Sequence, residues 1–478
     1  MTIDVAVVGA GPAGLAAATR CARLGLATTL FDENSAPGGQ IYRGITEAPA
    51  ARVALLGADY ARGAALVDAF RATTAAYVPG ASVWSARALP NATIELGVST
   101  RGAGVSGRTP TTHIVRARAA ILATGAQERP FPIPGWTLPG VMSVGGAQIL
   151  LKTAGLVPQG RVVIAGSGPL LWLAAGQLMD AGATIDALVE TVPRGRLREA
   201  LAHAPAFMMS PYFRKGLDLA RRVRRRTRVV EFVESLAATG TAHVEALRYA
   251  VDGKAHELAV DHLLLHQGVV PSVDLAGAAG CVLRWNDLHA CNEPAVDEWG
   301  GTTVASLFVA GDGGGIAGAD AAAARGTLTA LAVANALGRI DHRDRDREAA
   351  ALRRTLADAQ RGRRFFDVLY RPADSFRVPT GDTLACRCEE VTAGEIVDAV
   401  RAGCTGPNQA KAWLRCGMGP CQGRNCALTV TELIAQARGV TPGEVGTFRH
   451  RFPVKPLTLA ELASVPTTPG ANAAVVRE

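Results

Sequence analysis

The stretch from Thr2 to Gln40 constrains the fold more than any other part of the chain. An apolar run stops at the turn Gly9–Gly14, a Leu/Ala-rich helical pattern follows, and a second apolar run, Ala27–Phe31, ends on Asp32 and Glu33. Strand, glycine turn, helix, strand and acid are the parts of a Rossmann-like dinucleotide-binding unit, in the required order. We therefore predict an α/β fold with such a unit at its start.

Each position of this turn has a physical role in holding a pyrophosphate. Gly9 permits the tight turn, Gly11 lets the phosphates approach backbone N–H groups, and Gly14 lets the helix pack closely on the sheet. The acid that ends the second strand would accept hydrogen bonds from ribose hydroxyls, and spacing favours Asp32 over Glu33. The candidate cofactor-binding residues here are Gly9, Gly11, Pro12, Ala13, Gly14, Asp32 and Glu33.

Three later motifs indicate which dinucleotide is bound. They are Gly38-Gly39-Gln40, Ala123-Thr124-Gly125 and Leu307-Phe308-Val309-Ala310-Gly311-Asp312. With them the chain resembles the flavoproteins of the glutathione/thioredoxin-reductase type, which have two dinucleotide-binding domains. The resemblance implies FAD, with Asp312 on its ribityl chain and the glycine-rich run 313–318 leading into a helix that points at the flavin ring. The further candidates are Gly39, Gln40, Arg43, Val83, Ala123, Thr124, Gly125, Gly311 and Asp312.

Composition limits the class of protein. A chain of 478 residues suits two or three domains, and 48% hydrophobic with 19% charged residues is typical of a globular protein. No apolar run is long enough for a transmembrane segment, and the chain enters a strand at once, so we expect a cytoplasmic protein. The net charge of +8 comes with scattered arginines and no nucleic-acid motif, which argues against nucleic-acid binding. The cluster 221–228 is interpreted as a solvated face or a subunit contact.

A second nucleotide-type fold is predicted from Arg161. The strand Val162–Ala165 leads into the turn Gly166–Leu171 and a helix, and the strand Ile185–Val189 closes on Glu190. Leu171 stands where the third glycine is expected and would push the helix away from the sheet. Two hypotheses stay open: Gly166, Gly168 and Glu190 bind NAD(P) or another adenine nucleotide, or the domain is kept for architecture.

The C-terminal part contains two cysteine pairs, Cys386-Arg387-Cys388 and Cys421-x4-Cys426. Nine cysteines without an export signal favour ligation over disulfides, and thiolates suit iron–sulfur clusters or zinc. The pairs resemble those of the bacterioferritin-associated ferredoxin-like domain, a small helical fold. That resemblance implies a 2Fe–2S cluster on Cys386, Cys388, Cys421 and Cys426. Structural zinc is the alternative, Cys416 is a rival ligand, and Cys404 is interpreted as structural.

The whole chain resembles one group: the FAD/2Fe–2S component, of the A or alpha type, of heteromeric bacterial opine oxidase, D-hydroxyproline dehydrogenase and hydrogen cyanide synthase. The shared motifs are GGQIYR, LFVAGDGGGIAGADAA, CRCEEV, GMGPCQGRNC and FPVKPLTLAEL. The resemblance implies that a D-amino-acid-oxidase-like FAD or FMN subunit oxidises the amine. The present chain would pass the electrons onward, and a small ferredoxin-like subunit would be a further partner.

The sequence lacks features of a substrate-oxidising site, which supports assigning amine oxidation to the partner and electron transfer to this chain. Cys21, Cys281 and Cys291 form no redox pair, and no histidine–carboxylate set or arginine clamp marks an internal substrate site, so no residue is assigned a catalytic role. The alternatives are a stand-alone NAD(P)H-dependent reductase with the cluster as electron exit, or a scaffold. The expected domains are 1–125 and 281–340 for FAD, 126–280 for the second nucleotide fold, 341–380 for a helix and linker, 381–440 for the cluster and 441–478 for a tail.

Overall fold

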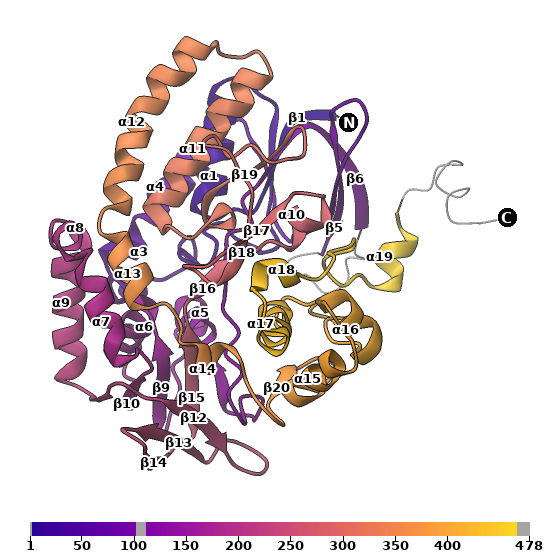
Figure 1. Ribbon diagram of the computed structural model, residues 1–478. Coiled ribbons are helices and arrows are strands. Elements are labelled where there is room, and N and C mark those ends of the chain that lie inside the picture. Colours follow the sequence, from indigo (N-terminus) through magenta and orange to yellow (C-terminus); the bar gives the residue numbers. More distant parts are fainter. Residues whose placement is uncertain (1, 102–110, 466–478) are drawn as a thin grey trace.

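The computed structural model describes residues 2–101 and 111–465. Two sheets with their helices form the body of the molecule, and a smaller helical region lies beside them (Figure 1). The Gly/Ser/Thr/Arg-rich sequence 99–112 predicts a hairpin loop, and most of it falls outside the described residues. Among the helices of the described part, none combines the length and the apolar character that crossing a bilayer requires.

The first sheet brings the two halves of the predicted FAD domain together. Its strands are β1 (Thr2–Val8), β2 (Thr28–Phe31), β3 (Ala76–Val78), β4 (Ala81–Ala88), β5 (Ile94–Thr100), β6 (Thr111–Leu122) and β19 (Leu307–Val309). The order is β3-β2-β1-β6-β5-β4, and β19 pairs with β6. Because β1, β6 and β19 run parallel, their carboxyl ends meet at one edge, as in other nucleotide-binding sheets.

Helices α1 (Pro12–Arg23) and α11 (Ala319–Ala336) pack tightly against each other on this sheet. A Cβ added at Gly326 would lie 2.1 Å from the Ala13 carbonyl oxygen, so the two backbones touch. The sequence of residues 51–76 predicts a single helix, and that prediction is wrong. The stretch is broken into α2 (Ala50–Leu56), α3 (Ala58–Ala61) and α4 (Gly63–Arg71), because Gly57 adopts a positive φ of 89°.

The second sheet is parallel and five-stranded, in the order β11-β10-β9-β15-β8. Its strands are β8 (Val141–Ser143), β9 (Val162–Ser167), β10 (Ile185–Glu190), β11 (Arg228–Val230) and β15 (His262–Gln267). Helices α5 (Val144–Ala154), α6 (Pro169–Asp180), α7 (Arg194–Leu201), α8 (Ala204–Met208) and α9 (Pro211–Arg224) accompany them. A small sheet of β12 (Ser235–Thr239), β13 (Ala246–Val251) and β14 (Lys254–Ala259) and the ribbon β7 (Ala126–Glu128)–β16 (Val269–Pro271) complete this part.

The chain between the sheets and the C-terminal region is more helical than expected. The charged, alanine-rich sequence 343–364 predicts one helix in the 341–380 region. The structure has two helices there, because Gly362 in the left-handed region separates α12 (His342–Gln360) from α13 (Arg363–Leu369). The connector after Arg371 contains α14 (Asp374–Arg377). Earlier in the chain lie α10 (Asp274–Ala278), the hairpin β17 (Leu283–Asn286)–β18 (Cys291–Pro294) and the short helix η1 (Gly311–Gly314).

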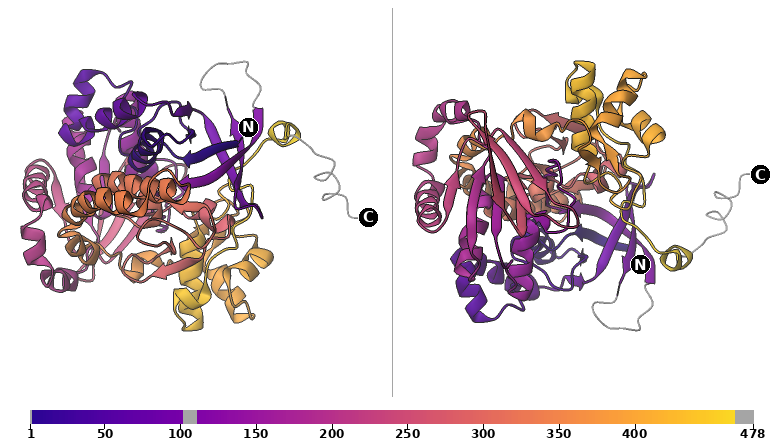
Figure 2. Two further views of the ribbon diagram at one scale, coloured as in Figure 1. Left: turned by 90° about the horizontal axis from the view of Figure 1, so that it is seen from above. Right: turned by 90° about the horizontal axis from the view of Figure 1, so that it is seen from below.

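The C-terminal region is a small helical unit with its own core. It contains β20 (Leu384–Cys386), β21 (Val391–Thr392), α15 (Ala393–Arg401), α16 (Pro407–Leu414), α17 (Ala427–Arg438), α18 (Pro442–Val445) and α19 (Leu459–Ala463). Figures 1 and 2 show it on the opposite side of the molecule from α7–α9. The end of the described chain returns to the first sheet, where Val454 N donates to Trp84 O and Arg101 pairs with Glu461.

Candidate functional site

The first glycine turn leaves no room for side chains. Gly9 has a φ of 103°, and a Cβ there would lie 2.4 Å from the Ala123 carbonyl oxygen. A Cβ at Gly14 would lie 1.8 Å from the Gly9 carbonyl oxygen. Helix α1 begins at Pro12 with Gly11 as its N-cap and no side-chain cap, which leaves its first N–H groups for an anion. The geometry therefore suits a pyrophosphate.

The structure separates the two candidate acids. Asp32 is buried, and its carboxylate accepts hydrogen bonds from Ala10 N at 2.5 Å and from Asn34 N at 2.7 Å. Glu33 points away and forms an ion pair with Lys455 of the C-terminal segment. Asp32 is thus the acid beside the turn, as the spacing favoured.

Unpartnered polar atoms lie close to Asp32. The Tyr77 hydroxyl and Arg43 Nε are buried, and neither has a hydrogen-bond partner in the described part of the chain. Burial, reinforced by the Asp32 charge, raises the pKa of Tyr77. Buried polar atoms normally have partners, so the site fits the polar adenosine half of a bound dinucleotide. Val83 belongs to the adjacent buried sheet core.

The ribityl end of the expected site brings distant motifs together. A Cβ at Gly313 would lie 3.3 Å from Thr124 Oγ1, and Thr124 donates to the Ser272 carbonyl oxygen at 3.0 Å. The Asp312 carboxylate accepts hydrogen bonds from Ala317 N at 2.9 Å and Gly318 N at 3.2 Å. Gly311 and Gly125 both have positive φ angles. Asp312 is therefore held in one orientation at the start of α11.

The GGQ motif also approaches the first turn, and it contacts a residue that sequence reasoning missed. A Cβ at Gly39 would lie 2.7 Å from Gly11 Cα. The buried Lys152 of α5 donates from Nζ to the Gln40 carbonyl oxygen at 3.1 Å and to Gln148 at 3.0 Å. Burial lowers the pKa of Lys152 to about 8. No local motif identified this lysine, because it reaches Gln40 from α5, a helix of the second sheet that is more than a hundred residues away in the sequence.

The second glycine turn has the expected backbone. Gly166 and Gly168 have φ angles of 136° and 117°, and a Cβ at Gly166 would lie 1.6 Å from the His266 carbonyl oxygen. The apolar stretch 262–270 predicts that His266 is a core or domain-interface histidine rather than a metal ligand. The structure agrees, because His266 is buried on β15 and its Nδ1 lies 2.6 Å from Glu128 Oε1. Leu171 is fully buried in the core, and α6 begins at Pro169 in spite of it.

The acid of this second turn is covered by the protein's own side chains. Glu190 is 9% exposed, and Trp172 Nε1 donates to its Oε1 at 3.2 Å. Burial raises the pKa of Glu190 to about 7. Tyr370, which follows α13, lies next to both residues, and its pKa is raised by burial and by the Glu190 charge. Glu190 is thus poorly placed to accept bonds from a ribose.

A histidine–carboxylate cluster that the sequence did not reveal lies beside the loop that holds Asp312. His289 Nδ1 lies 3.0 Å from Glu293 Oε1, and His289 Nε2 lies 3.7 Å from Asp367 Oδ2. Asp367 and Glu293 raise the pKa of His289 to about 9. Arg325 and Arg363 line the same cavity. The cluster joins a β-hairpin to two separate helices, so no local sequence pattern reveals it.

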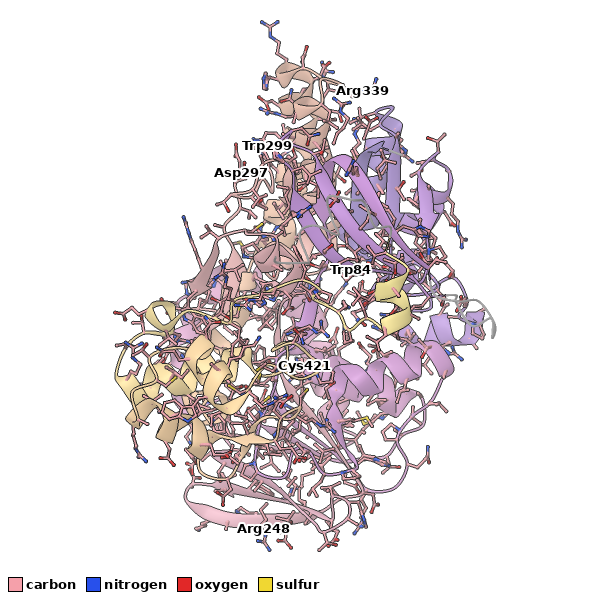
Figure 3. The ribbon with its side chains drawn as sticks, turned by 90° about the vertical axis from the view of Figure 1, so that its right-hand side faces the viewer. Trp84, Arg248, Asp297, Trp299, Arg339 and Cys421 are labelled. Atoms are coloured by element: carbon pink, nitrogen blue, oxygen red, sulfur yellow. The ribbon has the colours of Figure 1, made fainter. Side chains whose placement is uncertain are left out.

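The four candidate thiols converge in the C-terminal region. Cys386 contacts Cys426, which contacts Cys421, which in turn contacts Cys388. Figure 3 labels Cys421 near the middle of the molecule, at the edge of the yellow helices. The Cys426 thiol and backbone N–H groups lower the pKa of Cys386 to about 6, and the Cys426 thiol lowers that of Cys421 to about 5.

In the described residues, no three His, Cys, Asp or Glu side chains converge as ligands of a single metal ion. A binuclear cluster spreads four thiolates over two irons and is tuned by hydrogen bonds to its sulfurs. The N–H groups directed at Cys386 and Cys421 fit that requirement. Cys404 donates to the Gly406 carbonyl oxygen at 3.3 Å, and burial raises the pKa of Cys416 to about 12.

Comparison with known proteins agrees with this arrangement. Residues 3–326 match the family described as pyridine nucleotide-disulphide oxidoreductase, and residues 383–465 match the sarcosine oxidase A3 domain. The opine oxidase A subunit of Agrobacterium tumefaciens (strain Ach5) is 46% identical, over 99% of this chain and 93% of that protein.

Two further matches are more distant. The hydrogen cyanide synthase subunit HcnB of Pseudomonas aeruginosa is 31% identical, over 98% of this chain and 100% of that protein. The crystal structure of L-proline dehydrogenase from P. horikoshii superposes with a TM-score of 0.69 at 20% identity. The superposition covers 97% of this chain and 79% of the proline dehydrogenase chain, and at this identity it supports the fold alone.

Proposed function

This chain belongs to the pyridine nucleotide-disulphide oxidoreductase family and, within it, to the opine oxidase A subunits, and we propose that it transfers electrons within a heteromeric dehydrogenase or oxidase. It is an oxidoreductase and a flavoprotein. The proposed complex oxidises a secondary amine or amino acid of the opine, D-hydroxyproline or glycine type. The proposed partner, a D-amino-acid-oxidase-like FAD or FMN subunit, carries out that oxidation, and a small ferredoxin-like subunit is a further candidate partner.

One contact carries the proposal: the thiol loop is hydrogen-bonded to β7, which follows the Ala123-Thr124-Gly125 motif that lies against the first glycine turn. Gln127, two residues after Gly125, donates from Nε2 to the Arg424 carbonyl oxygen at 3.0 Å. Arg424 lies between Cys421 and Cys426 and donates in turn to the Val454 carbonyl oxygen at 2.7 Å. A flavin in the first turn and a cluster on the thiols would therefore be neighbours.

The residues present suit both groups. FAD would be held by the Gly9–Gly14 turn, Asp32 and Asp312, and a 2Fe–2S cluster by Cys386, Cys388, Cys421 and Cys426. When bound, the flavin supplies two-electron chemistry and the cluster supplies one-electron transfer; the protein's task is to position and tune them. The exposed Trp413 and Met418 lie on α16 and near the thiol loop and are candidates for partner contact.

The partner requirement is tested by expressing the chain alone and together with its genomic neighbour. Each preparation is assayed with a dye acceptor on octopine, nopaline, hydroxyproline isomers and glycine. We expect turnover only with the neighbour present. Turnover by the isolated chain on any of these compounds would contradict the division of labour.

The cluster assignment is tested by substitution. Cys386→Ser or Cys421→Ser should abolish the visible iron–sulfur absorbance, because each removes a thiolate ligand. Cys404→Ser is the matched control, since the Cys404 thiol is buried and is not among the four thiols that contact one another. Cys416→Ser tests the rival ligand, and we expect it to keep the absorbance. Iron and acid-labile sulfide are measured per chain. Zinc without labile sulfide would refute the assignment.

The second candidate is a stand-alone NAD(P)H-dependent reductase, with an adenine nucleotide at Gly166 and Gly168. The positive φ angles of these glycines favour it. Trp172 and Tyr370, which cover Glu190, weigh against it. Rapid bleaching of the purified chain's flavin by NADH would support this candidate over the electron-transfer role.

A further inference from the structure

A cavity of 290 Å³ lies beside the loop that holds Asp312. Three parts of the chain form its wall: the β17–β18 hairpin, the backbone from Gly314 to Ala317 with Arg325 of α11, and the end of α12 with α13. Pockets for small ligands start at about 300 Å³. The cavity is therefore of a size suited to a metabolite rather than to a macromolecule.

Hydrogen-bond donors dominate this wall. Arg325 donates a hydrogen bond from Nη1 to the Gly315 carbonyl oxygen at 2.5 Å, and Arg363 donates one from Nε to Asp367 Oδ1 at 3.2 Å. Their remaining guanidinium N–H groups find no acceptor within the described residues. The buried His289 Nε2 also lacks a hydrogen-bond partner there. The buried imidazole nitrogen is a donor without a protein acceptor, and the two guanidinium groups that line the cavity add further donors, so a ligand rich in acceptors suits this wall.

The carboxylates on the wall are already engaged. Glu293 accepts from Asn286 Nδ2 at 3.0 Å and contacts His289 Nδ1 at 3.0 Å. Asp367 accepts from Arg363, and its other oxygen faces the imidazole. An imidazole between two carboxylates stays protonated at neutral pH, so His289 adds a cationic donor. Both Glu293 oxygens are thus hydrogen-bonded, and Asp367 Oδ2 makes an ion-pair contact with the imidazole, so an ammonium group on a ligand would compete with His289 for that oxygen.

We propose that this cavity binds a small carboxylic acid that carries no cationic group, with 2-oxo acids as the best-matched class. The carboxylate would take the free N–H groups of Arg325 and Arg363, which suit planar carboxylates. The neighbouring carbonyl oxygen would accept from His289 Nε2. The site lies on this chain alone, so the inference does not depend on which partner donates the electrons.

Isothermal titration calorimetry on the FAD-loaded chain tests the proposal with two matched pairs, 2-oxoglutarate against glutamate and pyruvate against alanine. Each pair shares a carbon skeleton and differs in carbonyl or ammonium. We expect each 2-oxo acid to bind at least about tenfold more tightly than its amino acid, the loss for one unsatisfied charged hydrogen bond. Equal affinities within both pairs, or no binding by any of the four, would overturn the proposal.

Variants locate the site. Arg325→Gln and Arg363→Gln should each weaken 2-oxoglutarate binding at least about tenfold. Arg248→Gln, at an exposed arginine on β13, is the control and should leave it unchanged. Gln360 lines the cavity at the end of α12, so Gln360→Lys should strengthen and Gln360→Glu weaken binding, each by up to about fivefold.

The Gln360 pair keeps the test decisive if an arginine variant does not fold, since a gain in affinity requires folded protein. Insensitivity to the Gln360 charge would overturn the proposal. Binding only after FAD removal would also overturn it, because the cavity would then belong to the flavin. Neither result bears on whether a partner protein is required, which is measured separately.

Discussion

The turn at Gly9–Gly14 and the turn at Gly166–Leu171 both follow a buried parallel strand and both open a helix. Their surroundings differ. The first ends beside Asp32, with unpartnered polar atoms next to it. The second ends beside Glu190, which Trp172 and Tyr370 cover. A glycine turn thus permits nucleotide binding, and the residues packed over its acid decide whether the site is open.

The largest effect is expected from making the first turn like the second. Gly14→Leu should abolish FAD binding, because even a Cβ would lie 1.8 Å from the Gly9 carbonyl oxygen. FAD per chain is measured by flavin absorbance and folding by thermal unfolding. Gly216→Leu on α9 is the control, since a Cβ there has nothing within 4 Å. A yellow, fully loaded Gly14→Leu protein would show that the first turn is not the FAD site.

Removing the leucine of the second turn should lower the stability of the protein without creating an NADH site. Leu171→Ala should lower the free energy of unfolding by about 2–5 kcal/mol, because Leu171 is fully buried and leaves a cavity. Denaturant unfolding measures this loss, and Leu173→Ala, at a more exposed leucine of the same helix, should cost much less. If NADH binding appeared in Leu171→Ala, the leucine rather than the covered acid would be what closes the second turn.

The covered acid should make stability depend on pH. Burial raises the pKa of Glu190 from 4.5 to about 7, so folding favours its protonated form. The associated stability is fully present below pH 4.5 and is lost as pH rises to about 7, amounting to at most about 3 kcal/mol. Glu190→Gln should remove this loss, whereas Glu257→Gln, at an exposed carboxylate, should not. The free energy of unfolding is measured across this pH range for the wild type and for Glu190→Gln. Parallel pH profiles of the two proteins would contradict the assignment of the pH dependence to Glu190.

The smallest effect is expected for FAD affinity when Asp32, the acid beside the first turn, is changed. Asp32→Asn should weaken FAD binding by about 1.5–3 kcal/mol, the range for a hydrogen bond to a charged group. Glu33→Gln should change FAD affinity little, because Glu33 faces Lys455. Both affinities are measured by titrating FAD into the apoprotein. A larger loss in Glu33→Gln than in Asp32→Asn would reverse the assignment of the ribose acid.

Local sequence patterns were sufficient for the fold class and the family. The order of strand, glycine turn, helix and acid predicts a Rossmann-like unit, and the structure confirms two. Backbone geometry explains this success, because only glycine tolerates the positive φ of Gly9 or Gly166 and the contacts made there. The spacing of Cys386, Cys388, Cys421 and Cys426 likewise indicated four thiols that the fold brings together.

Tertiary structure alone decided which sites are open and what surrounds them. Asp367 reaches His289 from a separate helix, and Lys152 reaches Gln40 from the other sheet's helix. Tyr370 covers Glu190 from the linker after α13. Such contacts join segments that have no shared period or motif, so a local pattern carries no record of them. Burial then sets the protonation of Lys152, Glu190 and their neighbours, because desolvation depends on the whole packed environment rather than on residue type.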